Sequence, residues 1–165
     1  MIIKDSLSAK SKDGLSEVRS LAQKIPTKIS AEFSHVLELI RARDDEIMIV
    51  SGGFVELIMP LARALEIDKV VGNEFVFSAT GDFVGLKQSV LTDNHGKAKI
   101  LAAEKNNFTE IIMIGDGITD AETKTAGVAD QFWAYTEHQR REPVVALADR
   151  EIADMSKLVQ VLAEM

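Results

Sequence analysis

The sequence contains no cysteine among its 165 residues. This absence excludes disulfides, zinc–thiolate sites and thiol nucleophiles. No apolar run approaches the roughly 20 residues that a membrane-spanning helix needs. The amino-terminal stretch MIIKDSLSAKSK also lacks the long apolar segment of a signal peptide. We therefore expect a cytoplasmic protein that has no membrane partner.

Positive charge is also scarce. The chain has 19 lysines and arginines against 26 aspartates and glutamates, which gives a net charge of −7. An acidic chain is poorly suited to nucleic acid, so we expect no nucleic-acid partner. The sequence has no Gly-x-Gly-x-x-Gly segment after a strand, which argues against an unrelated nucleotide-binding Rossmann domain.

What the sequence does contain is an alternation of short apolar strands and amphipathic helices. This pattern predicts an α/β fold in which helices cover both faces of a parallel sheet. In such sheets, ligands bind beyond the carboxyl ends of the strands. Strands are expected over 46–51, 69–72, 110–116 and 131–136, with a hairpin around 79–82. Helices are expected over 16–43, 54–65, 95–107, 119–127 and 156–165. Pro26 is expected to break the first of these helices, and Pro60 is expected to disturb the first turns of the second or to delay its start.

The segment VSGG, residues 50–53, ends one expected strand just before a helix. The Ser51 hydroxyl and the backbone N–H groups of Gly52 and Gly53 can form an anion pocket at a helix N-terminus. Phosphate suits such a pocket because its oxygens accept several hydrogen bonds. The alternative is a turn that simply requires two glycines.

The segment IGDGITD, residues 114–120, ends another expected strand in two aspartates. Mg²⁺ prefers oxygen ligands and keeps several waters, so one or two carboxylates suffice to bind it. The spacing lets Asp116 bind the metal directly while Asp120 stands in the outer shell or caps the helix. The alternative is that Asp116 is a turn residue and that Asp120 or Thr119 is only an N-cap.

Lys97 opens the helix that begins in HGKAK, where a cation is unfavourable for the helix dipole. It therefore needs an anionic partner, such as a phosphate or the two carboxylates; the alternative is a solvated surface lysine.

His35, His95 and His138 show no metal-ligand spacing. The basic segment HQRRE, residues 138–142, is expected to be a solvated helix face.

In their order along the chain, VSGGF, a hairpin, GKAK and GDGITD resemble the haloacid dehalogenase-like (HAD) superfamily and, within it, the phosphoserine phosphatases. The resemblance implies a three-layer Rossmann-like core with a small β-hairpin flap. It also implies a Mg²⁺-dependent hydrolase of small phosphomonoesters such as phosphoserine. By position, Ser51, Lys97 and Asp116 would be catalytic; Ser51, Gly52 and Lys97 would bind phosphate; and Asp116, with Asp120 in the outer shell, would bind the metal.

The family also uses an earlier Asp-x-Asp-x-Thr/Val motif, whose first aspartate is the nucleophile and whose second is the general acid and base. The sequence does not contain it: from Asp5, the next two motif positions are Leu7 and Ala9. The segment DSLSAK instead resembles the late cap region, with Lys10 in place of an arginine that binds the substrate carboxylate. We therefore expect a cap remnant over 1–28, the core over 29–165 as one compact domain, and a chain truncated at its amino terminus.

The missing motif predicts that the chain is inactive or weakly active alone. In this fold the missing strand lies between those that end at Ser51 and Asp116, so backbone and apolar faces would be exposed. The two strands can close up, MIIK or another chain can fill the gap, or the natural protein is longer. The alternative function is a non-catalytic remnant that binds an anion or a protein, as a strand-exchanged homodimer.

Overall fold

The computed structural model describes residues 13–24 and 30–165. These residues form two compact units. The first comprises residues 13–24 and 47–89, and the second comprises 30–46 and 90–165. The expectations for Asp5, Lys10 and Pro26 fall outside the described residues. The division into a cap remnant over 1–28 and a core over 29–165 stays a prediction.

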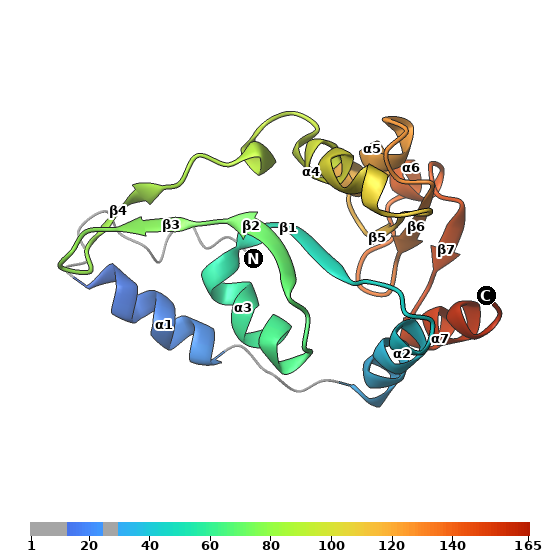
Figure 1. Cartoon of the computed structure of the whole chain (residues 1–165), viewed down its shortest axis with the longest axis horizontal. Helices are drawn as coiled ribbons and strands as arrows, with labels where there is room; N and C mark the ends of the chain where they lie inside the picture. Colours follow the sequence, from blue (N-terminus) through green and yellow to red (C-terminus); the bar gives the residue numbers. More distant parts are fainter. Residues whose placement is uncertain (1–12, 25–29) are drawn as a thin grey trace. The chain divides into compact units, whose positions relative to one another are not determined.

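The first unit contains a parallel strand pair, a hairpin and two helices. β1 (Met48–Phe54) pairs in parallel with β2 (Lys69–Asn73), and α3 (Val55–Ala64) connects them. β3 (Phe75–Phe77) and β4 (Phe83–Leu86) form the expected antiparallel hairpin. α1 (Gly14–Lys24) packs against α3, and Figure 1 shows both helices on the same side of the strands.

A cluster of aromatic rings ties the end of β1 to the hairpin. The rings of Phe54 and Phe75 stack with centroids 4.0 Å apart and an interplanar angle of 14°. Phe83 meets Phe75 edge-on at 5.9 Å. Offset-stacked and edge-to-face ring pairs add about 0.5–1.5 kcal/mol beyond the burial of their area. The residue that follows the VSGG segment is therefore anchored on β3.

α3 corrects one expectation from the sequence. Pro60 was expected to disturb the first turns of this helix or to delay its start, yet α3 begins at Val55 and runs through Pro60. Proline removes one intrahelical hydrogen bond and crowds the preceding turn. The buried side chains of Ala62 and Leu65 follow it, so packing of the apolar face outweighs this local cost.

The second unit is built on a three-stranded parallel sheet in the order β5–β6–β7, formed by β5 (Ile112–Gly115), β6 (Gln131–Tyr135) and β7 (Arg150–Ile152). Its α-helices are α2 (Ala31–Ala42), α4 (Gly96–Glu104), α5 (Ile118–Thr125), α6 (Glu142–Val145) and α7 (Met155–Ala163). Two short 3₁₀ helices, η2 (Val90–Thr92) and η3 (Lys105–Asn107), flank α4.

Helices cover both faces of this sheet. Because alternate side chains of a strand point to opposite faces, Trp133 of β6 packs with Val36 of α2 and Leu158 of α7. Phe132 packs on the other face with Val144 of α6. Figure 1 shows α2 and α7 together on one side of the sheet, and α4, α5 and α6 on the other. The predicted α/β fold with parallel strands is confirmed, and this unit has the three expected layers.

The sequence did not predict β7 or α6. β7 has three residues, two of them the exposed and charged Arg150 and Glu151, so it offers no apolar run to recognise.

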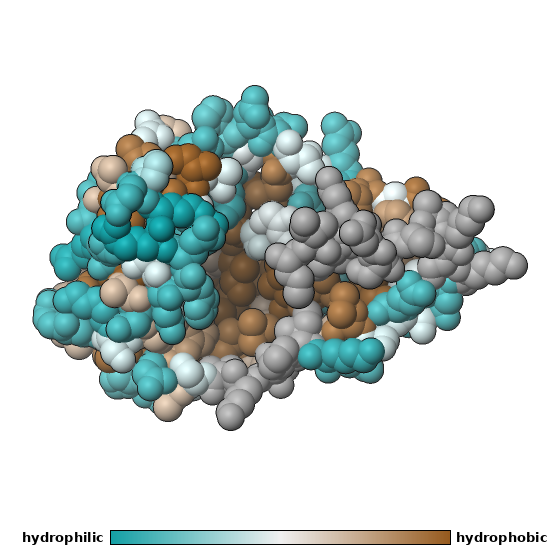
Figure 2. Space-filling view, turned by 180° about the vertical axis from the view of Figure 1, so that it is seen from behind, coloured by the Kyte–Doolittle hydropathy of each residue, from teal (hydrophilic) through white to brown (hydrophobic). Residues whose placement is uncertain are grey.

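Among the described residues, no helix is long and apolar enough to cross a membrane. Apolar side chains such as Val84 and Leu86 of the hairpin do reach the surface, and Figure 2 shows apolar atoms among hydrophilic ones on the face it presents.

Candidate functional site

Three of the predicted site residues line one pocket of the second unit. This pocket has a volume of about 760 Å³ and lies at the carboxyl end of β5, where α5 begins. Ligands of parallel sheets bind at this edge. Its lining residues are Lys97, Asp116, Gly117, Ile118, Thr119, Asp120, Arg141, Pro143 and Val144.

Lys97 and Asp120 form a tight ion pair at this pocket. Lys97 Nζ lies 2.6 Å from Asp120 Oδ1, and the two side chains are only 17% and 7% exposed. Asp120 Oδ2 accepts a hydrogen bond of 3.0 Å from the backbone N–H of Gly117, at the start of α5. Lys97 is therefore no solvated surface lysine. Both carboxylate oxygens of Asp120 already have hydrogen-bond partners. This arrangement is compatible with an outer-shell residue of a metal site or with a helix cap.

Gly115 makes room for this arrangement. A Cβ atom at Gly115 would lie 2.3 Å from both Cγ and Oδ2 of Asp120. No real Cβ tolerates such a contact, so any other residue at this position would displace Asp120. The glycine that ends β5 is thus required by the close approach of the carboxylate that follows it.

Asp116 has a different environment. Its side chain is 58% exposed, and Arg141 Nη1 donates to both its Oδ2 and its backbone oxygen, each at 2.6 Å. Its Oδ1 has no hydrogen-bond partner among the described residues. An exposed carboxylate oxygen beside a pocket suits a Mg²⁺ ion that keeps most of its waters. The part of the chain that the structure describes holds no group of three or more His, Cys, Asp or Glu side chains placed to bind one metal ion.

Arg141 is the site residue that the sequence interpretation missed. The segment 138–142 was expected to be a solvated helix face, but residues 136–141 are not helical, and Arg141 turns back to the end of β5. One signal for this existed. The residues that follow β6 emerge at the same sheet edge as those that follow β5, because the two strands are parallel.

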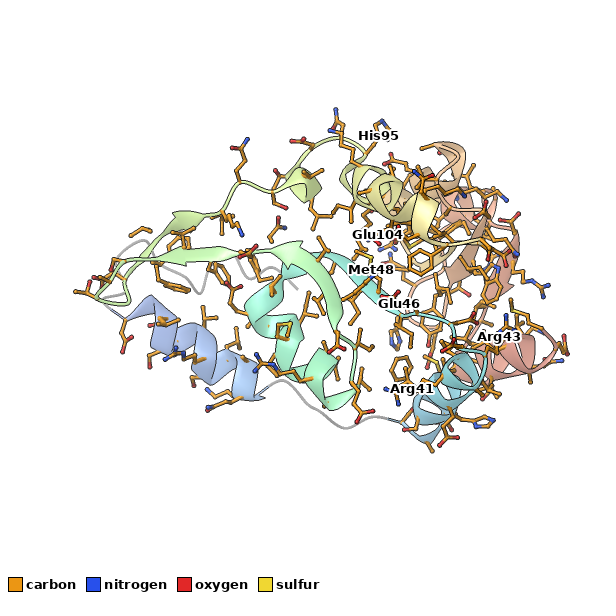
Figure 3. The ribbon with its side chains drawn as sticks, viewed as in Figure 1. Arg41, Arg43, Glu46, Met48, His95 and Glu104 are labelled. Carbon is orange, nitrogen blue, oxygen red and sulfur yellow. The ribbon has the colours of Figure 1, made fainter. Side chains whose placement is uncertain are left out.

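The histidines do not gather into a metal site among the described residues. His95 precedes α4 with a left-handed φ of 58°, and its Nδ1 lies 3.2 Å from Oε2 of Glu122. Figure 3 labels His95 and Glu104 at the two ends of this helix. His35 is exposed and contacts Glu38, and the ring of His138 lies edge-on to Tyr135.

Ser51, Gly52 and Gly53 lie in the first unit, at the end of β1. The backbone N–H of Gly53 donates to Ser51 Oγ at 3.0 Å, and both glycines are exposed. Gly52 does not have a left-handed φ, and a Cβ atom there would meet nothing within 4 Å. Neither backbone conformation nor packing therefore requires glycine at this position. The exposed backbone of Gly52 is open to close approach by a ligand.

The structure thus brings Lys97, Asp116 and Asp120 together in one pocket, and adds Arg141 to them. Ser51 and Gly52 lie near the end of β1 in the other unit, where Gly52 is exposed. Lys10, the predicted contact of the substrate carboxylate, lies outside the described residues. The roles assigned to these residues in catalysis, phosphate binding and metal binding stay predictions.

Comparison with known proteins agrees with the motifs. The family model for haloacid dehalogenase-like hydrolases matches residues 3–123, a range that includes Ser51, Lys97, Asp116 and Asp120. The chloroplastic phosphoserine phosphatase of Arabidopsis thaliana is 33% identical over 156 residues, which are 92% of this chain and 53% of that protein. The phosphoserine phosphatase of Bos taurus is 28% identical over 153 residues, 90% of this chain and 67% of that protein.

The fold has relatives among solved structures as well. A phosphoserine phosphohydrolase-like protein from Francisella tularensis superposes with a TM-score of 0.77 and 25% identity, over 90% of this chain and 70% of that one. The chain spans about half the length of the Arabidopsis relative and about two thirds of the bovine one. The predicted resemblance to phosphoserine phosphatases is confirmed, and the chain belongs to the haloacid dehalogenase-like hydrolase family.

Proposed function

We propose that this chain supplies the phosphate- and magnesium-binding half of a phosphomonoester hydrolase of the phosphoserine phosphatase type. The substrate class would be a small phosphomonoester such as phosphoserine. The observation that carries the proposal is the pocket at the end of β5. There the nearly buried carboxylate of Asp120 holds Lys97. The neighbouring carboxylate of Asp116 is exposed, and its Oδ1 has no hydrogen-bond partner among the described residues.

Each residue has a distinct role in this proposal. Lys97 would bind a phosphoryl oxygen as a charged donor, and Asp120 would position its ammonium group through the 2.6 Å contact. In the first unit, the Ser51 hydroxyl and the Gly52 N–H are donors that suit a phosphoryl group, the role that the resemblance to the family implies for them. Asp116 would hold Mg²⁺, which when bound offsets the negative charge of the phosphoryl group.

The chemical step needs groups that these residues do not provide. The sequence has no Asp-x-Asp-x-Thr/Val segment, and in the resembling enzymes this segment carries the nucleophile together with the acid and base. Binding without a positioned nucleophile does not give rapid hydrolysis. We therefore propose that the chain alone binds the phosphoryl group but turns it over slowly or not at all.

A phosphatase assay tests this proposal. The full chain is incubated with phosphoserine and Mg²⁺, and released inorganic phosphate is measured against a buffer control. We expect phosphate release far slower than ordinary enzyme turnover, which is about 1–1,000 per second. Turnover at that rate would contradict the proposal, and its loss in Asp5→Asn would then identify Asp5 as the nucleophile.

A second candidate function is a binding module that assembles by strand exchange. The observation in its favour is that, among the described residues, β1 pairs only with β2 and β5 only with β6. An unpaired edge of an apolar strand invites pairing with another chain. Light scattering after size-exclusion chromatography would give a dimer mass for this candidate, and a monomer mass would contradict it.

A further inference from the structure

A bulge in β1 shapes the loop of residues 51–53, which we name the anion loop. Val50 pairs with Val71 and Phe54 pairs with Asn73, so Ser51, Gly52 and Gly53 together face Gly72 alone. A bulge withdraws peptide groups from the ladder and re-aims them. The bulge therefore explains why the two glycines of a strand are exposed.

We propose that Asn73 is the positioning residue of the anion loop, an inference that rests on the proposed function. Asn73 Nδ2 donates a hydrogen bond of 2.8 Å to the backbone oxygen of Gly52. In a planar trans peptide, the C=O of one residue and the N–H of the next point in opposite directions. By holding Gly52 O, Asn73 turns the Gly53 N–H away from itself, toward Ser51 Oγ at 3.0 Å.

This orientation leaves the Ser51 hydroxyl ready to donate. Its oxygen accepts from Gly53, so its own proton remains available for an incoming phosphoryl oxygen. If the Gly52–Gly53 peptide flipped, a carbonyl oxygen would replace the N–H beside Ser51 and would repel an anion. A single side-chain amide thus determines whether the loop presents donors or an acceptor.

The environment of the Asn73 side-chain oxygen indicates that this bond matters. Among the described residues, two buried side-chain oxygens lack a hydrogen-bond partner, Asn73 Oδ1 and Glu56 Oε2. An unpaired buried acceptor is unfavourable, and an apolar residue at position 73 would avoid it. Turning the Asn73 amide over would not help, because Oδ1 would then face the Gly52 oxygen. The gain that offsets the unpaired Oδ1 is the Nδ2 bond to the loop.

The surroundings hold both the loop and Asn73 in register. A Cβ atom at Gly72 would lie 3.0 Å from Gly53 O, so glycine there lets β2 approach the bulge. Glu56 Oε1 accepts from the Phe75 N–H at 3.0 Å, which ties the start of α3 to β3. With the stack of Phe54 on Phe75, the segments on either side of Asn73 are fixed and its amide has little freedom to move.

Two variants of the full chain test the inference. Asn73→Asp keeps the shape but sets an acceptor against Gly52 O, and Asn73→Leu removes both the donor and the unpaired oxygen. The matched control is Asn107→Asp, an exposed asparagine whose amide contacts Glu104. Amide NMR spectra of each protein are recorded without ligand and during titration with inorganic phosphate in the presence of Mg²⁺, and thermal unfolding is measured in parallel.

We expect the Gly53 amide resonance to move in both Asn73 variants before phosphate is added, and phosphate affinity to fall about tenfold, the effect of losing one well-aligned hydrogen bond. Asn107→Asp should leave both unchanged. A folded Asn73→Leu protein with an unmoved Gly53 resonance and an affinity within about twofold of the original chain would overturn the inference. Failure of the original chain to bind phosphate would instead overturn the proposed function. The ligand-free Gly53 shift would still decide whether Asn73 orients the peptide.

Discussion

At the residue scale, the chain uses similar ion pairs in very different ways. Lys97 and Asp120 are nearly buried, whereas Lys99, two positions along the same helix, pairs with Asp93 while both side chains are more than half exposed. Exposed pairs contribute little to stability because water screens them. Removing one partner of a buried pair leaves an uncompensated charge, which is far more costly.

This contrast predicts unequal effects from the same substitution. Lys97→Met should lower the free energy of unfolding by about 3 kcal/mol, because Asp120 keeps only the Gly117 N–H as its partner. Lys99→Met should lower it by less than about 1 kcal/mol. Urea unfolding of the two variants and the original chain measures both values; equal losses would contradict the buried pair.

Two glycines give a second prediction at this scale. Gly115→Ala should destabilise the chain by about 1–3 kcal/mol through overpacking against Asp120. Gly52→Ala meets no neighbour within 4 Å, so it should change stability by less than about 1 kcal/mol while weakening phosphate binding. Thermal unfolding and phosphate titration separate the two effects. Unimpaired phosphate binding in Gly52→Ala would argue against the anion loop.

The residues that follow strands could be predicted from sequence, but their supporting partners could not. Ser51, Lys97, Asp116 and Asp120 stand next to recognisable strands and helix starts, and a local pattern reveals them. Asn73 acts through a bulge whose register only the folded sheet sets. Arg141 lies 25 residues from Asp116, its partner, in a segment without regular structure that a basic composition alone assigns to solvent.

At the scale of elements, two aspartates accept hydrogen bonds from the backbone at the starts of neighbouring strands. Asp130 accepts from the Ile111 N–H at 2.8 Å and from Lys105 at 2.7 Å. Asp149 accepts from the Phe132 N–H at 2.8 Å and from Lys124. These hydrogen bonds favour the charged carboxylates. The pKa of Asp130 is lowered, first by Lys105 and then by the Ile111 N–H, and the pKa of Asp149 is lowered by Lys124 and the Phe132 N–H.

These shifts predict the sign of the acid response. Because the folded pKa of each aspartate lies below its ordinary value of 3.8, their contribution to stability is fully present above that value. It is lost as the pH falls through the lower folded pKa. Urea unfolding between about pH 5 and pH 2.5 should therefore show a shallower acid decline in the double variant Asp130→Asn, Asp149→Asn than in the original chain.

The control for this experiment is Asp93→Asn, which removes an exposed carboxylate that also pairs with a lysine. Among the described residues, this carboxylate makes no hydrogen bond to a strand backbone. Its acid decline should match that of the original chain. A double variant that declines as steeply as the original would show that these aspartates do not fasten the sheet in the charged form.

Most elements could be predicted from the sequence, because strands such as β5 and β6 are apolar and helices such as α7 carry a clear apolar face. Prediction from the sequence was wrong or incomplete for the elements in which local preference and tertiary packing disagree. α3 runs through Pro60 despite its cost, and β7 forms from charged residues because the neighbouring edge of β6 offers hydrogen-bond partners. Both cases depend on contacts that no short window of sequence contains.

At the scale of the whole molecule, the chain combines the fold of its family with a sequence that has no Asp-x-Asp-x-Thr/Val segment. Family membership and the alternating pattern could be predicted from the order of the motifs. The division of the described residues into two compact units, with a separate parallel sheet in each, could not, because strand pairing over long sequence distances leaves no local signal. The central question is therefore whether the chain binds phosphate and Mg²⁺ together.

Calorimetric titration of the full chain with inorganic phosphate, with Mg²⁺ and then with EDTA, measures this directly. We predict binding that requires Mg²⁺ and is weakened at least about tenfold in Asp116→Asn, because that carboxylate would hold the ion. Asp93→Asn, with the same charge change outside the pocket, should bind as the original chain does. Phosphate binding that is indifferent to EDTA and to Asp116→Asn, or no binding at all, would contradict the account.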